Sequence, residues 1–342
     1  MRRVPCRLGA AAAVIILMSL PATPLAGQAG TARKPASGAK KGNVYRTPWG
    51  DPDLQGIWTG STITPLERPA KFADKKVLTE AEAVALEKDA LAGQVDRPPR
   101  PGDPGTYNQI WFDPSSKVLP DRRTSLIVDP PDGRIPFTPE GAKAQEIARQ
   151  SYGHGDYSSW LGFDTGERCL TDGPPIYFSG YNNNYEIVQS PGHVAILHEL
   201  YREVRVIPLD GQPFSNIPSL TGNPRGHWEG DTLVVESANF RQLEGARWAD
   251  AWRTVRRSTH LVERFKRVDE HTIDYRFTWQ DPTIFTRPWT AAYPLTNDQS
   301  SRGVTSGPLY EYACHEGNYA LVNVLNAART AEKAAAKKSS SK

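Results

Sequence analysis

The chain contains little cysteine and methionine, with three and two residues among 342. Three common catalytic signatures are also missing: a Gly-x-Ser-x-Gly elbow, a phosphate-binding loop, and a dinucleotide fingerprint following a strand. These absences argue against common serine hydrolases, nucleotide enzymes and nicotinamide enzymes. No internal repeat period stands out, which argues against a solenoid or a propeller.

Local metal-binding motifs are missing as well. The seven histidines form no His-x-His or His-Glu-x-x-His pattern, and no Cys-x-x-Cys occurs. Glu229 and Asp231 follow His227 closely, but Gly230 between them indicates a hairpin turn. The sequence therefore predicts no metal and no cofactor. A metal site assembled from distant strands stays open as an alternative.

The first 29 residues have the order of a secretory signal peptide. Arg2, Arg3 and Arg7 precede an apolar run over 8–20, and small residues follow it. The run is shorter than a membrane span needs, although a membrane anchor is the alternative interpretation. We therefore predict cleavage after Ala29, a periplasmic or secreted protein, and no stable membrane anchor after cleavage.

The positive charge lies at the two ends of the chain. The formal net charge is +3, and the leader alone carries three arginines. Residues 30–46 add five basic residues without an acid, and residues 327–342 hold five basic residues and one acid. The body between them, 47–326, is acidic. Nucleic-acid binding rests on neutralising phosphates, so no nucleic-acid partner is expected.

The composition divides the body into two parts and predicts disordered ends. Residues 30–46 form a basic linker, and 327–342 form a helix end and basic tail rich in Ala, Lys and Ser. Residues 47–174 read as an irregular N-terminal wrap with two helices, near 79–91 and 139–151. Thr79 with Glu82 has the capping-box spacing of the first helix. A further helix begins near Asn318.

Residues 175–326 alternate in hydrophobicity like an antiparallel β-meander. In TIDYRFTW, one face carries Ile273, Tyr275, Phe277 and Trp279. Seven candidate strands are separated mainly by tight turns, which favours a lipocalin-like antiparallel barrel over a Greek-key sandwich. The expected fold class is mainly β. The strand candidates are YNNNYEIVQSP, HVAILHELY, EVRVIPLD, HWEGDTLVVESANF, STHLVERFKRVDE, HTIDYRFTWQD and RPWTAAYPL.

Several longer motifs carry a family resemblance. RTSLIVDPPDGRIP, GHWEGDTLVVESANF and YEYACHEGNY together resemble a family of exported, largely uncharacterised bacterial proteins, over about 47–329. No established activity comes with that resemblance. Separately, GIW at 56–58 resembles the Gly-x-Trp signature of the first lipocalin strand, although about 120 residues intervene before the meander.

Two cysteines remain after the predicted cleavage, Cys169 and Cys314. An even count in an oxidising compartment favours a disulfide between them. The alternative is a reactive Cys314 beside His315. Adjacent strand residues point to opposite faces, which makes that pairing awkward.

Acid–base candidates come from the charged strands. In HELYREVRV, Glu199, Tyr201 and Glu203 share one face, while His198, Leu200 and Arg202 share the other. If Glu199 and Tyr201 face the interior, burial raises the pKa of the carboxyl group toward the range of a general acid.

A second carboxylate lies in HLVERFKRV. Glu263, if buried, needs an arginine partner, and Arg202, Arg205 and Arg276 are available. The alternative for each carboxylate is a solvated, outward charge. Tyr201, His227 and His315 are the candidates for orienting or polarising a substrate.

The abundant aromatic residues supply the ligand-binding candidates. Nine tryptophans and 13 tyrosines suit a stacking surface, although a β-rich core uses the same residues. The sequence gives no signal for oligomeric state. The expected function is binding or turnover of an apolar, aromatic or sugar-like small molecule in the barrel. A cofactor-free hydrolase, lyase or isomerase and an envelope structural protein are the alternatives. The expected ligand-binding residues are Trp228, Trp279, Tyr185, Asn184 and Arg264.

Overall fold

The computed structural model describes residues 45–101, 105–106, 115–151, 157–178, 180–242, 250–298 and 307–340. All of them belong to one compact unit, Asn43–Lys342. The predicted signal peptide, 1–29, and nearly all of the predicted linker, 30–46, lie outside the described residues.

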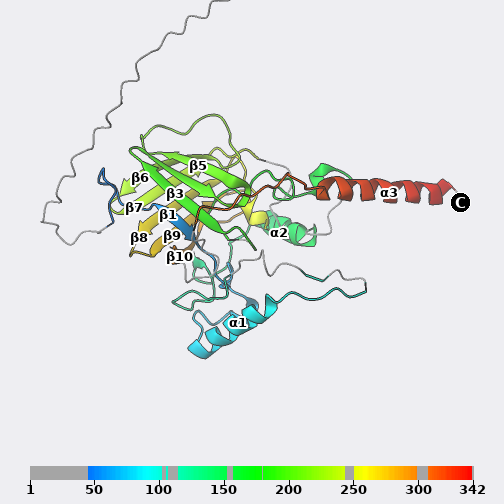
Figure 1. Ribbon diagram of the computed structural model, residues 1–342, viewed down its shortest axis with the longest axis horizontal. Coiled ribbons are helices and arrows are strands. Elements are labelled where there is room, and N and C mark those ends of the chain that lie inside the picture. The colour runs from blue at the N-terminus through cyan, green and yellow to red at the C-terminus, as the bar shows by residue number, and fades with distance from the viewer. Residues whose placement is uncertain are drawn as a thin grey trace, which may run out of the picture. The chain divides into compact units, whose positions relative to one another are not determined.

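The described part of the chain forms a nearly closed antiparallel β-barrel (Figure 1). Nine strands follow one another in the order β5-β4-β3-β1-β10-β9-β8-β7-β6, and β2 pairs with β10 beside this path. The predicted mainly β meander barrel is therefore confirmed. The strands are β1 (Gly56–Thr59), β2 (Ile127–Asp129), β3 (Asn184–Ser190), β4 (His193–His198), β5 (Glu203–Pro208), β6 (Asn223–Glu229), β7 (Thr232–Ala238), β8 (His260–Arg267), β9 (Thr272–Gln280) and β10 (Trp289–Thr296).

Strand β1 joins two meanders that are separate in the sequence. It pairs with β3 through four residues and with β10 through Thr59 opposite Thr296. Trp58, the tryptophan of the GIW motif, is fully buried. The distant N-terminal strand thus completes the sheet between β3 and β10.

Side-chain packing closes the barrel between β5 and β6. A Cβ atom built on Gly226 of β6 would lie 2.6 Å from Leu209 and 2.8 Å from Ile207 of β5. The absence of a side chain at Gly226 therefore permits this close approach.

Three α-helices lie outside the sheet: α1 (Glu80–Gly93), α2 (Pro139–Ser151) and α3 (Ala320–Ser340). Both parts of the capping box predicted for Thr79 and Glu82 are present. Helix α3 extends to Ser340 and so covers most of 327–342, for which a helix end and a disordered tail were predicted. Its alanines have high helix propensity. Short 3₁₀ turns occupy η1 (Ala70–Phe72), η2 (Trp160–Gly162), η3 (Leu200–Arg202) and η4 (Ala251–Arg253).

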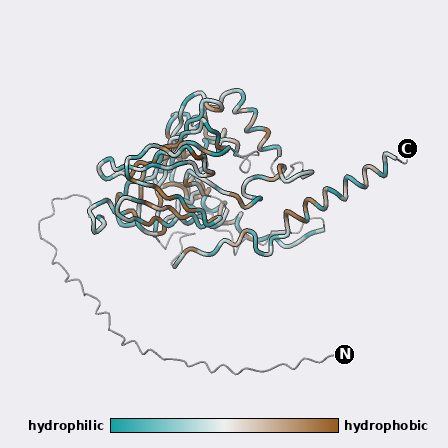
Figure 2. The backbone as a smooth tube through the Cα atoms, turned by 90° about the horizontal axis from the view of Figure 1, so that it is seen from above, coloured by the Kyte–Doolittle hydropathy of each residue, from teal (hydrophilic) through white to brown (hydrophobic). Residues whose placement is uncertain are grey.

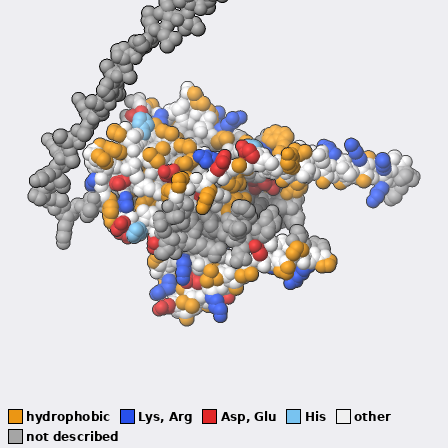
Figure 3. Space-filling model, in the orientation of Figure 1, with side chains coloured by type: hydrophobic (Ala, Val, Ile, Leu, Met, Phe, Trp, Pro, Cys, Tyr) orange, Lys and Arg blue, Asp and Glu red, His pale blue; other side chains and the backbone are white. Residues whose placement is uncertain are grey.

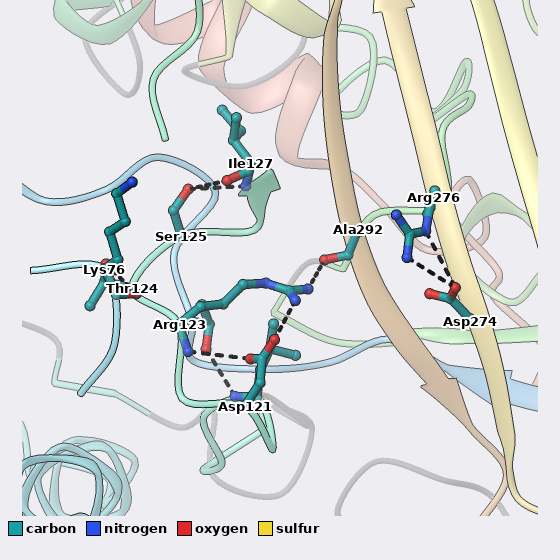
Figure 4. A network of polar contacts seen from close by, with 11 residues as sticks. Lys76, Asp121, Arg123, Thr124, Ser125, Ile127, Asp274, Arg276 and Ala292 are labelled. Atoms are coloured by element: carbon teal, nitrogen blue, oxygen red, sulfur yellow. Dashed lines mark hydrogen bonds and ion pairs between the residues drawn. The ribbon is translucent and has the colours of Figure 1, made fainter. Parts of the chain in front are cut away.

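The N-terminal wrap is hydrogen-bonded to the barrel through the segment around Arg123 (Figure 4). The Arg123 guanidinium donates to the carbonyl of Ala292 in β10 and pairs with Asp121. The amide of Ala292 in turn donates to the carbonyl of Leu126, at 3.0 Å. These hydrogen bonds attach the N-terminal wrap to Ala292 of β10.

Large side chains fill the barrel. Apolar segments concentrate along its strands (Figure 2). Trp252 lies edge-on to Trp279 and Trp289, with ring centroids 6.1 and 5.4 Å away. Such close-packed aromatic side chains leave little internal space. The largest fully buried side chains are Trp58, Trp279, Trp289, Tyr275, Tyr293, Phe240, Phe265 and Phe277.

A segment of the chain itself packs against the inner face of the barrel. We call residues 171–178 the plug. The backbone amide of Ile176 donates to the Tyr275 hydroxyl at 3.0 Å, and its carbonyl accepts from the Tyr293 hydroxyl. The Tyr185 hydroxyl bonds both backbone groups of Tyr177. Three inward tyrosines therefore bond the backbone groups of Ile176 and Tyr177 in the plug.

Candidate functional site

Strand register places Tyr185, His198 and Glu203 side by side. Tyr185 of β3 is opposite His198 of β4, which is opposite Glu203 of β5. Directly opposed residues of antiparallel strands have adjacent side chains on one face. The Tyr185 ring stacks on the His198 ring, with centroids 4.1 Å apart and planes 11° apart.

Asp172 of the plug lies near His198. The Asp172 carboxylate is fully buried and lies 4.0 Å from Nδ1 of His198. Arg253 of η4 donates to the same carboxylate oxygen at 2.8 Å. Burial would lower the pKa of Arg253, but the neighbouring Asp172 charge helps to raise it above its usual value. Asp172 is therefore held as the counter-ion of Arg253, beside the imidazole.

Glu203 binds the start of the plug through one carboxylate oxygen. Its Oε2 accepts from the Thr171 hydroxyl at 2.6 Å and from the amides of Asp172 and Gly173, each at 3.1 Å. Its Oε1 is buried without a hydrogen-bond partner in the described part of the chain. One carboxylate oxygen is thus committed to structure, while the other is available for a ligand or water.

A buried ion pair lies next to this row. Arg205 of β5 pairs with Glu263 of β8 through its two terminal guanidinium nitrogens, Nη1 and Nη2, and the Tyr275 hydroxyl donates to Glu263 at 2.8 Å. Burial would lower the pKa of Arg205, but the Glu263 charge and hydrogen bond raise it. Nε of Arg205 is buried and has no partner among the residues described. Arg205 was one of three partners predicted for a buried Glu263.

A small cavity lies between the plug and this row of side chains. Its volume is about 10 Å³, close to the space that one water molecule needs. Glu203 and Arg205, each of which has one unpartnered polar atom among the described residues, line it. The lining residues are Gly173, Pro174, Pro175, Ile176, Tyr185, Ile196, His198, Glu203 and Arg205.

Left-handed backbone conformations also gather near the site. Tyr201 and Arg202, which link β4 to β5, have φ values of +60° and +50°. Cys169 and Asn182 each have a φ of +53° and flank the plug in sequence. Non-glycine residues rarely adopt this region, and such strain concentrates at functional sites. The strain supports this part of the barrel as the candidate site.

Replacing Arg202 with glycine is expected to raise the free energy of unfolding by roughly 0.5–1 kcal/mol. The left-handed conformation costs an L-residue about 1–2 kcal/mol, and the greater chain entropy of glycine offsets part of the relief. Urea unfolding measures the change. The matched control is Val204→Gly. Val204 is an exposed strand residue two positions away, and glycine there should destabilise the protein. Destabilisation by Arg202→Gly would contradict the strain argument.

Cys169 and Cys314 form a disulfide, as predicted, with Cα atoms 5.9 Å apart. Cys169 lies two residues before the plug, and Cys314 lies six residues before α3. The disulfide therefore connects the chain just before the plug with the segment that precedes α3.

The predicted catalytic residues do not converge. Glu199 is buried and accepts from Asn184 at 2.7 Å and from the amide of Tyr310 at 3.2 Å. Tyr201 is partly buried, and its ring lies edge-on to Tyr312 at 5.1 Å. Burial and the neighbouring Tyr312 raise the pKa of the Tyr201 phenol. Two predicted residues, Glu199 and Asn184, are therefore brought together, outside the cavity lining.

The remaining acid–base candidates lie apart from one another. Glu263 is fully buried and paired with Arg205. His227 is exposed, 3.3 Å from Glu229, and Arg264 pairs with the same carboxylate. His315 is exposed, and its carbonyl accepts from the amide of Asn318.

The predicted aromatic ligand residues contribute mainly to packing. Trp279 is fully buried against Phe240 and Trp252. Trp228 is half-buried against the core. Among these candidates, Tyr185 lines the cavity.

Sequence reasoning did not select His198, Asp172 or Arg253, and it assigned Glu203 to the wrong face relative to His198. The expected strand ran through Tyr201, but β4 ends at His198 and η3 interrupts the alternation. His198 continues the inward series of Val194 and Ile196, which was the available signal. The alternation restarts at Glu203, so both residues face inward.

The comparisons with known proteins gave no match. No family model matches the chain, and no curated protein or solved structure shows significant similarity to it. Among the described residues, no helix is long and apolar enough to cross a membrane.

Proposed function

We propose that the protein is a cofactor-free hydrolase of a small molecule, with His198 as its acid–base residue and Glu203 as the residue that holds the water. The observation that carries this proposal is the water-sized cavity lined by both side chains. Titratable groups that converge on a cavity are expected of acid–base catalysis, and Glu203 and Arg205 each keep a polar atom without a partner among the described residues. The compact aromatic interior argues against storage of a large ligand in the barrel.

The residues fit distinct roles in hydrolysis. His198 would accept a proton from water as the water oxygen bonds to the acyl carbon of an ester or lactone. The bond between that carbon and the leaving oxygen would then break, and the imidazolium would give its proton to the leaving oxygen. Asp172 would orient and stabilise the imidazolium, and its own charge is balanced by Arg253. Glu203 would hold the water through Oε1, and Nε of Arg205 would stabilise negative charge.

His198→Gln is expected to lower the rate of hydrolysis at least 100-fold, because general acid–base catalysis contributes about 10²–10⁴-fold. The test uses a panel of small chromogenic esters and lactones. His193→Gln is the matched control, since His193 begins the same strand but is exposed. Circular dichroism and urea unfolding establish that the variants fold. Absence of turnover by the wild-type protein, or equal rates in both variants, would refute the hydrolase proposal.

A structural role in the cell envelope is the second candidate. The observation that favours it is the interior filled by aromatic side chains and the plug. In this role, the buried charges would only anchor the plug. The protein would then lack turnover in the ester panel, while His198→Gln would still lower its stability.

We also propose that the protein is exported to the periplasm or secreted, and that it belongs to the exported bacterial family its motifs resemble. The Cys169–Cys314 disulfide supports export, because disulfides persist in oxidising compartments. Cell fractionation with intact-mass measurement tests this: the prediction is a mature chain beginning at Gly30. A full-length cytosolic chain would contradict it.

A further inference from the structure

Exposed apolar side chains occur in two segments on either side of the disulfide. In the first, Trp160 is 56% exposed, and Leu161 and Leu170 are also exposed. In the second, Tyr319 is 71% exposed, and Tyr310 and Val322 are also exposed. Isolated surface apolar residues are ordinary, but several in neighbouring segments indicate an interaction surface.

Two contacts bring these segments together. The Cys169–Cys314 disulfide joins them directly, and Arg329 of α3 donates to the carbonyl of Ser158. Apolar side chains accordingly gather where α3 leaves the barrel, with basic side chains along the helix (Figure 3). We call the six residues named above, together with α3, the C-terminal surface.

Helix α3 is the basic part of this surface, whereas the segment before it carries two exposed acidic residues, Glu311 and Glu316. The exposed basic residues of α3 are Arg329, Lys333, Lys337 and Lys338. Glu332 is the one acidic residue of the helix and pairs with Arg329 at 2.8 Å. Leu321, Val324, Leu325 and Ala328 share one stripe at helical spacing and are half-buried. The half-buried apolar residues therefore lie in the first half of α3, and the exposed basic residues follow them along the helix.

We propose that the C-terminal surface binds anionic lipid membranes reversibly. Exposed Trp and Tyr side chains suit the boundary between headgroups and acyl chains, and nearby lysines are attracted to anionic lipids. The basic charge of α3 therefore favours an anionic lipid layer. The lysines lie on a fully exposed helical stretch and form no shaped pocket, so recognition rests on charge and not on a fitted protein partner. This proposal is independent of the proposed hydrolysis.

The test is vesicle co-sedimentation of the chain from Gly30 onward, which keeps the whole compact unit. Vesicles of phosphatidylcholine with phosphatidylglycerol are compared with pure phosphatidylcholine. We expect binding to the anionic vesicles that disappears at about 0.5 M salt, where charges are screened within several ångströms. Lys333→Gln/Lys337→Gln/Lys338→Gln should weaken binding about 100-fold, since each lysine near such a surface contributes about 1 kcal/mol.

The matched control is Lys76→Gln/Lys88→Gln/Lys143→Gln, which removes three exposed charges from the wrap. It should bind nearly as well as the unmodified chain. Trp160→Ser/Leu161→Ser should weaken binding without changing its dependence on salt. Equal binding to both vesicle types, equal loss in the two lysine variants, or no binding at low salt would overturn the proposal. Sedimentation as a dimer through α3 would also overturn it and identify a second copy as the partner.

Discussion

Arg205→Ala is expected to lower the free energy of unfolding by roughly 3–5 kcal/mol, because it leaves the fully buried Glu263 without its cation. Tyr275 would remain as a hydrogen-bond donor to Glu263, but a neutral phenol does not compensate a buried charge. Urea unfolding monitored by tryptophan fluorescence measures the change.

Two further variants separate charge burial from general damage. Arg276→Ala removes an arginine from an exposed ion pair with Asp274 on β9, so it should change stability by about 0.5 kcal/mol or less. Arg205→Leu/Glu263→Leu removes both charges and should recover much of the loss. A double variant as unstable as Arg205→Ala would show that the uncompensated carboxylate is not the cause.

Removing the disulfide is expected to lower the free energy of unfolding by at most about 4–5 kcal/mol. The two cysteines are 145 residues apart in the sequence, so the disulfide closes a long loop. It lowers the entropy of the unfolded chain, and a loop of this length corresponds to a stabilisation of this size. The variant is Cys169→Ala/Cys314→Ala, and urea unfolding again measures stability. Reductant should destabilise the wild-type protein and leave the double variant unchanged. A loss below about 1 kcal/mol would show that other contacts already restrain the two segments.

The fold was largely predictable because its strands alternate along their length. Most meander strands have one buried and one exposed face, as in β9, where Ile273, Tyr275, Phe277 and Trp279 are all buried. The turn predicted at Gly230 joins β6 to β7. The positions of β1 and β2 in the sheet were harder to predict from the sequence. Both strands pair with β10, more than 150 residues away, and no local sequence pattern identifies so distant a partner.

The candidate site was less predictable because its chain path departs from regular strands. Tyr201 and Arg202 adopt a left-handed conformation, so face assignments carried through them fail. Asp172 and Arg253 lie outside the strands, and alternation gives no information there. The sequence could name Arg205 as a possible partner of Glu263, because a buried carboxylate needs a cation. Only the strand register of the structure identifies Arg205 among the three candidate arginines.

The plug precedes most of the barrel in the chain. It occupies 171–178, whereas Tyr185, Tyr275 and Tyr293, which hold its backbone, come later. During synthesis the plug is therefore available before β3–β10 exist, and N-terminal segments generally organise first. The barrel can assemble around its own contents, and no completed interior has to open to admit them.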